Sequence, residues 1–113
     1  MAELKTDFWA SALIRRAQLG GAFAAVARRG DRDAGDVLVK VATLDGRARL
    51  YSRVFRGEGE RGWLDLSAGA LGDGETQVDA YARRRSEDDP DLWIIEIEDK
   101  SGRTFLDEPI DRG

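Results

Sequence analysis

The residues best suited to chemistry lie in a short, turn-like stretch that is rich in aspartate and glycine. Asp31, Asp33 and Asp36 all fall within Gly30–Asp36. Carboxylate oxygens that converge from a tightly turned loop are the ligands that hard divalent cations prefer. The EF-hand spacing and its distal glutamate are absent, and Asp and Gly are also ordinary turn residues. The stretch therefore predicts a hairpin turn, with a divalent-metal loop at these three aspartates as the alternative.

A second candidate site lies on one face of a predicted strand. Arg47, Arg49, Tyr51 and Arg53 occupy alternate positions and therefore project to the same side. Arginines interleaved with an aromatic ring on a sheet can bind nucleic acid or another anion through charge and stacking. The alternative is an exposed strand face whose arginines pair across strands with the glutamates of residues 96–98.

Other motifs indicate no catalytic site. Pro90-Asp91 followed by Glu98-Asp99-Lys100 has the residue types of a PD…ExK nuclease, in which carboxylates bind a metal beside a lysine. Those groups normally come from two adjacent strands, whereas a single predicted strand carries them here. The glycine-rich stretches match neither GxGxxG nor GxxxxGK[ST], so no nucleotide-phosphate loop is indicated. We name no catalytic residue and expect no cofactor.

The composition removes whole classes of enzyme. The 113 residues include no His and no Cys. Ser-His-Asp hydrolysis, His-ligated zinc and thiol chemistry are therefore excluded within this chain, and an enzyme would depend on carboxylates, Lys, Tyr or Arg. There are 18 basic and 22 acidic residues, a net charge of −4, which disfavours non-specific nucleic-acid binding. The composition therefore disfavours an enzymatic function and disfavours nucleic acid as a partner.

The first half of the chain predicts a helix followed by three strands. Phe8–Leu19 follows a good N-cap, Asp7, and places apolar residues on one helical face, although a strand over residues 8–16 fits the same short run. Three strands then form a meander, with Asp45-Gly46 as a strong hairpin-turn signal. The strands are Ala22–Arg29, Asp36–Thr43 and Arg47–Arg56.

The second half predicts a short edge strand, a helix and a principal strand. The edge strand is Trp63–Leu66, in which Trp63 is either a core residue or a contact residue for a partner. The helix runs from the capping Asp73 to about Glu87, and Pro90 separates it from the next element. The principal strand, Asp91–Asp99, is the most apolar run in the chain. Its residues expected to form one buried face are Trp93, Ile95 and Ile97.

The end of the chain completes the predicted fold. Thr104–Leu106 is expected to pair back on the principal strand as a hairpin, and Asp107–Gly113 is expected to fray because Pro109 disfavours pairing. The elements predict a single α+β domain over residues 1–113. It has one mainly antiparallel sheet, formed by the three-stranded meander and the C-terminal hairpin, with two helices packed on one of its faces.

The sequence also bears on location. The segment that follows Met1 lacks the apolar core of a signal peptide. No apolar run approaches the roughly 18–20 residues that span a bilayer. We therefore expect a cytoplasmic protein with no membrane partner.

Several short motifs resemble those of one protein family. They are Trp9, Ala12–Arg16, Arg28–Asp31, Ala34-Gly35 and Asp89–Asp99. Together they look like those of the small bacterial proteins catalogued as domain of unknown function 1491, and the similarity covers nearly the whole chain. The resemblance implies a bacterial, stand-alone, single-domain protein. It implies no activity, substrate, cofactor or catalytic residue.

The leading functional hypothesis is a small non-enzymatic binding or interaction module. Its partner would be another protein or a second copy of the chain, bound through an exposed sheet edge. One alternative is a nucleic-acid or anion binder that uses the face with Arg49, Tyr51 and Arg53. The other is a carboxylate-dependent metal enzyme that uses the acidic turn.

Overall fold

The computed structural model describes residues 5–55, 57 and 61–112. The elements of this part of the chain are α1 (Thr6–Leu19), β1 (Phe23–Arg28), β2 (Val37–Ala42), β3 (Ala48–Phe55), β4 (Arg61–Asp65), the 3₁₀-helix η1 (Leu66–Ala68), α2 (Glu75–Asp88), β5 (Trp93–Glu98) and β6 (Ile110–Asp111). The first segment, which fitted a helix or a strand, is a helix. In the described residues, no helix is both long enough and apolar enough to cross a membrane.

The strands form one mixed sheet in the order β1-β5-β2-β3-β4-β6. β5 lies between β1 and β2, antiparallel to β1 and parallel to β2, with Ile95 opposite Val39. β6 is parallel to β4. The predicted three-stranded meander and mainly antiparallel sheet are therefore wrong. Helix α2 supplies the long crossover that a parallel pair requires, and this lets the most apolar strand enter the interior of the sheet.

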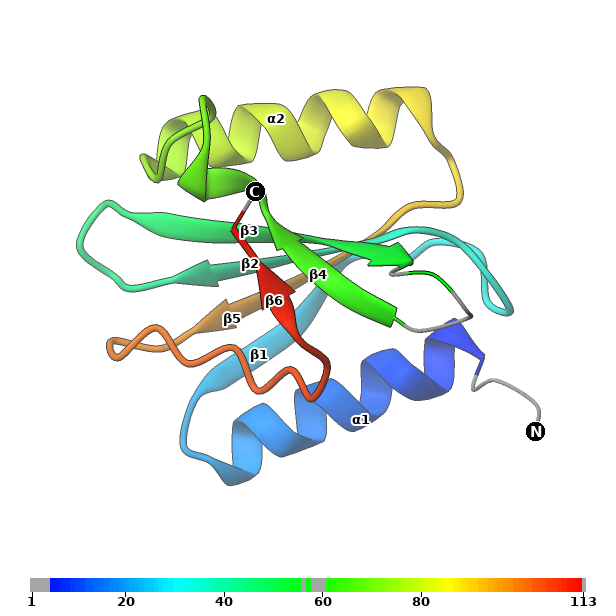
Figure 1. Ribbon diagram of the computed structural model, residues 1–113. Helices are drawn as coiled ribbons and strands as arrows, with labels where there is room; N and C mark the ends of the chain where they lie inside the picture. Colours follow the sequence, from blue (N-terminus) through cyan, green and yellow to red (C-terminus); the bar gives the residue numbers. More distant parts are fainter. Residues whose placement is uncertain (1–4, 56, 58–60, 113) are drawn as a thin grey trace.

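The two α-helices cover opposite faces of the sheet, with α2 above it and α1 below it in Figure 1. Strand β2 shows the division, because Val39 and Val41 belong to the core around α1 while Leu38 and Ala42 belong to the core under α2. All six residues of β2 are buried. The prediction of both helices on one face is wrong, because a central strand that is apolar on both faces needs a helix on each.

The apolar face of the principal strand is confirmed as the centre of the core around α1. Trp93, Ile95 and Ile97 are at most 1% exposed. On the same face, Trp9 of α1 stacks on Trp63 of β4, with ring centroids 5.4 Å apart. Trp63 is buried, so it is a core residue and not an exposed contact residue.

The C-terminal segment does not form the predicted hairpin with β5. Both edges of β5 are occupied, by β1 and β2, so no edge is left for Thr104–Leu106. That segment instead lies against α1, where the guanidinium of Arg16 donates two hydrogen bonds to the carbonyl of Phe105. The expected frayed tail, Asp107–Gly113, contains β6, and a β4 amide donates to the carbonyl of Pro109. Proline lacks the donor but keeps this acceptor, so it does not prevent the pairing.

Candidate functional site

Two loops meet at the end of the sheet where β2 and β5 begin. They are Arg29–Asp36, which joins β1 to β2, and Asp89–Leu92, which joins α2 to β5. The amide of Asp31 donates to the carbonyl of Asp91 at 3.0 Å. The indole Nε1 of Trp93 donates to the carbonyl of Asp31 at 2.6 Å. These bonds fix the two loops to each other beside the first residue of β5.

Two arginines strengthen this junction. The guanidinium of Arg28 donates to the carbonyls of Pro90 and Leu92. The guanidinium of Arg29 lies over the ring of Trp93, 5.1 Å from its centroid. The sequence motifs around residues 28–31 and 89–93 therefore form one structural unit, which holds the loops in place.

The three predicted metal ligands do not converge on one point. Asp31 Oδ2 accepts hydrogen bonds from the backbone amides two and three residues ahead, as in an Asx turn. Asp33 pairs with Lys5 at 3.4 Å, and Asp36 lies 3.9 Å from Arg85. Among the residues that the structure describes, no group of three Asp or Glu side chains has the arrangement of a metal site. A turn accounts for the contacts of Asp31 and separate ion pairs account for those of Asp33 and Asp36, so the geometry adds no support to the metal-loop prediction.

Most of the predicted basic and aromatic face is engaged within the protein. Tyr51 is buried in the core around α1, and this burial raises the pKa of its hydroxyl. Arg47 pairs with Asp73 at 3.0 Å, and Arg49 lies 3.4 Å from the buried Asp65. These side chains do not form the open stacking surface that nucleic-acid binding on a sheet requires.

Arg53 is the member of the predicted set that reaches the two loops. Its Nη2 donates to the carbonyl of Gly35 at 2.6 Å, and its guanidinium lies 5.9 Å from the ring centroid of Trp9. The alternative interpretation, in which these arginines pair with Glu96 and Glu98, is wrong because β2 lies between β3 and β5. Arg53 therefore belongs to the loop junction rather than to a basic strand face.

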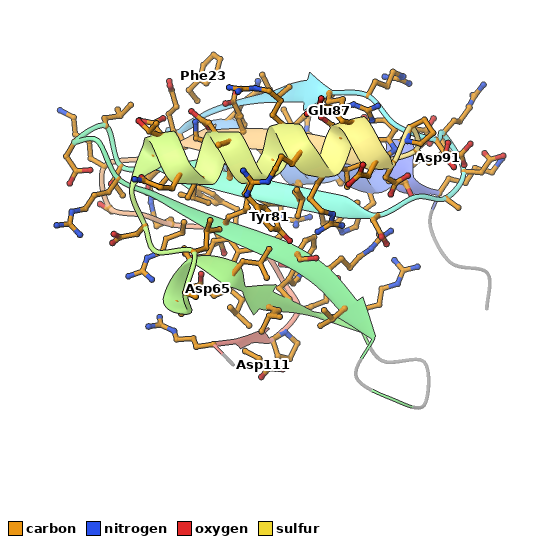
Figure 2. All side chains as sticks on the ribbon, turned by 90° about the horizontal axis from the view of Figure 1, so that it is seen from above. Phe23, Asp65, Tyr81, Glu87, Asp91 and Asp111 are labelled. Carbon is orange, nitrogen blue, oxygen red and sulfur yellow. The ribbon has the colours of Figure 1, made fainter. Side chains whose placement is uncertain are left out.

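A hollow of about 420 Å³ lies at this end of the molecule. Its volume is within the range of small-molecule sites. The walls come from the start of α1, the two loops, the end of β3 and the start of β4. Figure 2 shows Asp91 at this end, beyond the last turn of α2. Charged side chains in the lining include Lys5, Asp36, Arg53, Arg61, Asp89 and Asp91.

Acidic and basic residues of this hollow come from neighbouring strands of the sheet. Asp91 and Asp36 come just before β5 and β2, which are neighbours, while Arg53 and Arg61 lie on β3 and β4, the next two strands. Asp89 Oδ1 accepts a hydrogen bond from the amide of Asp91. Within the described ranges, the carboxylates of Asp89 and Asp91 form no ion pair. The hollow thus brings acidic and basic groups close together, as the bond from Arg53 to the carbonyl of Gly35, next to Asp36, also shows.

A separate charged cluster lies beneath α2. Lys40 of β2 is 6% exposed, and its Nζ lies 2.7 Å from Asp79, 2.8 Å from Glu75 and 3.4 Å from Glu96. Burial disfavours the charge on Lys40, but hydrogen bonds to Asp79 and Glu75 outweigh it and raise the pKa of Lys40. A lysine held in the charged form is a poor nucleophile, because the reactive form is the neutral amine. The cluster therefore ties α2 to the sheet.

The hollow includes residues that the sequence analysis did not single out. Lys5 and Arg61 belong to no motif, Asp89 was noted only as the first residue of a family motif, and three distant segments bring them together. Each stands at or beside the end of an element: Lys5 precedes α1, Arg61 begins β4, and Asp89 follows α2. The strand order decides which element ends meet, so the sequence carries no direct signal for this grouping.

Comparison with known proteins identifies a family and several similar solved structures. The family described as protein of unknown function (DUF1491) matches residues 4–107. A crystal structure of a DUF1491 family protein from Caulobacter crescentus is 54% identical to this chain, with a TM-score of 0.88. The match covers 96% of this chain and 100% of that one.

Two solution structures are also similar. An NMR structure of a DUF1491 family protein from Caulobacter crescentus is 53% identical, covers 98% of this chain and 99% of its own, and has a TM-score of 0.85. A protein from A. tumefaciens is 32% identical, with 95% of each chain covered and a TM-score of 0.75. The comparison with curated proteins gives no match. The chain belongs to the DUF1491 family of proteins of unknown function, as its motifs predicted.

Proposed function

We propose that this protein is a small non-enzymatic binding module that takes a polar small molecule into the hollow at the end of its sheet. The observation that carries the proposal is that five segments bring acidic and basic side chains together around about 420 Å³. Small-molecule sites place a few convergent polar groups in a cavity of this size. The hydrogen bonds between the two loops preorganise the walls, which lowers the ordering cost of binding. We place the module in the cytoplasm, because small secreted domains are commonly stabilised by disulfides and this sequence has no cysteine.

The described groups with shifted pKa values lie outside the lining of the hollow. Hydrogen bonds from Arg103 lower the pKa of Asp99, and a hydrogen bond from Thr43 lowers the pKa of Asp45. The pKa of Lys40 is raised. Each shift moves its group away from neutral pH, whereas general acids and bases are tuned toward the working pH. The sequence has no His to serve in that role.

A fragment screen followed in ¹⁵N–¹H correlation spectra tests the proposed site. We expect charged polar fragments to shift the amides of Ala34, Gly35 and Arg61 saturably, because these residues line the hollow. Amides near Leu44, in the turn between β2 and β3, serve as an internal control. Hits that gather elsewhere on the surface, or a screen without saturable hits, would contradict the proposal.

A second function, self-association, is favoured by the position of β1. It forms an edge of the sheet, and Phe23 and Val26 on it are 58% and 38% exposed. Figure 2 shows Phe23 at the margin of the molecule. If two β1 strands pair in antiparallel fashion about Ala24, Phe23 faces Ala25 of the second copy and Val26 faces its Ala22. Each large side chain then meets a small one, as suits a two-fold interface.

A charge placed on the edge strand tests this second function. We expect the purified protein to run as a dimer at high concentration in size exclusion with light scattering, and Val26→Lys to run as a monomer. Charged residues on edge strands oppose strand addition. Ala70→Lys, at an exposed loop position on the α2 side, is the matched control and should leave the dimer intact. A clean monomer for the unchanged protein would remove this function.

A further inference from the structure

We infer that the opposite end of the sheet docks a segment of a partner protein, one that presents a large apolar side chain beside a lysine or arginine. The site is a second hollow, of about 370 Å³. It lies where β2 and β5 end, whereas the hollow described above lies where they begin. The inference therefore goes beyond the proposed function and does not depend on it. The second hollow is lined by Gly21, Phe23, Leu44, Glu98, Asp99 and Lys100.

Two large apolar side chains frame the second hollow and are open to solvent. Phe23 is 58% exposed and Leu44 is 55% exposed. The start of β1 and the turn between β2 and β3 lie at the same end of the molecule (Figure 1). Exposed apolar side chains that gather in one place are typical of interaction surfaces. The second hollow lies on the β5 side of Phe23, so it does not overlap the free edge of β1.

The conformation of Leu44 is a separate observation. Its φ is +66°, in the left-handed region that glycine and asparagine adopt more readily than leucine. Asp45 holds the turn, because its carboxylate accepts hydrogen bonds from the hydroxyl of Thr43 and the amide of Arg47. A leucine that is both left-handed and exposed lowers stability, and the fold does not require it. Such outliers gather at binding sites, where contacts with another molecule account for them.

Hydrogen bonds around Asp99 fix one wall of the second hollow. Asp99 is buried and accepts hydrogen bonds from the guanidinium and the amide of Arg103, so their charges cancel. Its own amide donates to the carbonyl of Ala42, the last residue of β2. These bonds hold the turn after β5 in place, which lowers the ordering cost when a partner binds.

The charges beside the second hollow favour a basic partner. Glu98 lies opposite Phe23 of β1 and projects, like Glu96, to the α2 side of the sheet. Within the described part of the chain, Glu98 forms no ion pair. Lys40 and Lys100 supply two positive charges against four carboxylates on this side, which leaves a net charge of −2. The four carboxylates are those of Glu75, Asp79, Glu96 and Glu98.

The same net charge argues against a membrane as the covering surface, because anionic lipids repel a negative patch. A polypeptide segment can place an apolar side chain between Phe23 and Leu44 and a basic one beside Glu98. A lysine or arginine then forms charge-assisted hydrogen bonds to that carboxylate, which orient the segment.

A tripeptide with blocked ends and a phenylalanine between two lysines tests the inference when it is titrated into the full chain. We expect saturable shifts of the amides of Phe23, Leu44 and Lys100 in ¹⁵N–¹H correlation spectra. With alanine at its centre the peptide should bind at least about tenfold more weakly, because it lacks the side chain that fills the hollow. With glutamates in place of the lysines it should bind at least about fivefold more weakly, because the patch repels them. Amides of Ala34 and Gly35, in the other hollow, serve as the control.

The variant Leu44→Asn separates binding from folding. Asparagine adopts the left-handed region readily but has no large apolar side chain. We expect the urea midpoint of unfolding to stay the same or rise, and the Kd for the lysine-flanked peptide to increase at least about tenfold. Phe8→Asn makes the same kind of change at an exposed apolar position outside the second hollow, and it should leave the Kd within about twofold.

The variant Glu98→Gln tests the contribution of charge. We expect the Kd to rise about two- to fivefold at low salt, as for an exposed ion pair, and the difference to shrink at high salt. Glu87→Gln removes the same charge at an exposed position near the C-terminal end of α2, and it should leave the Kd unchanged.

A lysine-flanked peptide that gives no saturable shift at Phe23 and Leu44, or that shifts Ala34 and Gly35 instead, would overturn the inference. A Leu44→Asn variant that unfolds at lower urea and keeps its affinity would also overturn it, since the leucine would then serve the fold. Sedimentation of the full chain with phosphatidylcholine vesicles, if Leu44→Asn abolished it, would identify a membrane as the covering surface and contradict a protein partner. The polar fragments of the earlier screen lack a large apolar group, so the two hollows are tested independently.

Discussion

Replacing Gly30 with alanine is expected to lower the free energy of unfolding by about 3 kcal/mol or more, since overpacking against fixed atoms is destabilising. An added Cβ would lie 2.1 Å from the carbonyl oxygen of Asp91 and 2.6 Å from the carbonyl carbon of Leu92. Both contacts are with backbone, which the hydrogen bonds from Asp31 and Arg28 hold in place. Relief would require the two loops to separate at the first residue of β5. Urea unfolding, followed by tryptophan fluorescence, measures the loss.

The matched control is Gly69→Ala, because the nearest atom to a Cβ added there is the carbonyl oxygen of Leu66 at 3.8 Å, an ordinary contact. We expect this variant to stay within about 0.5 kcal/mol of the unchanged protein. Similar unfolding curves for the two variants would show that the loops are not held together as described. Because the same loops line the hollow, Gly30→Ala should also weaken binding of any ligand there.

The sequence predicts burial in this protein better than it predicts which strands are neighbours. The alternation in residues 93–97 identifies the buried wall of β5, and Asp45-Gly46 identifies the hairpin between β2 and β3, where Gly46 has a φ of +86°. Neither pattern shows that β5 lies between β1 and β2. That position follows from the crossover through α2, and local periodicity contains no information about it.

The candidate site shows the same limit of local patterns. The aspartates of residues 31–36 are noticeable in the sequence, but turn hydrogen bonds and separate ion pairs use them individually. Arg53 was expected on a nucleic-acid face, yet it lies beside the loops because its strand ends there. Arg61 and Asp89 join it only through the strand order. A site built from the ends of elements can be recognised once those ends have been placed in space.

The second large effect is expected at Lys40. Lys40→Ala would leave Glu75, Asp79 and Glu96 close together without their shared cation. Breaking a buried ion pair by removing one partner costs about 3–5 kcal/mol. The three carboxylates are between a third and a half exposed, so we expect a loss near the low end, about 3 kcal/mol. Urea unfolding at neutral pH measures this loss.

The effect of Lys40 should depend on pH. Burial opposes its charge, but hydrogen bonds to Asp79 and Glu75 raise its pKa in the folded protein. A raised lysine pKa contributes stability that is fully present below the unfolded-state value, about 10.4, and is lost as pH rises through the folded-state value. The stability difference between the unchanged protein and Lys40→Met should therefore be constant from pH 7 to about pH 9 and should shrink above pH 10.5.

Two controls separate lost pairing from lost packing. Lys40→Met/Glu75→Gln/Asp79→Asn removes the cation together with its two nearest carboxylates, and it should recover most of the stability lost in Lys40→Ala, because no unpaired charges remain beneath α2. Lys100→Ala, at an exposed position, should change stability by less than about 0.5 kcal/mol. If Lys40→Ala proved no more costly than Lys100→Ala, the cluster would not be what ties α2 to the sheet. The apolar contacts of Val78 and Ala82 would then account for the attachment of that helix.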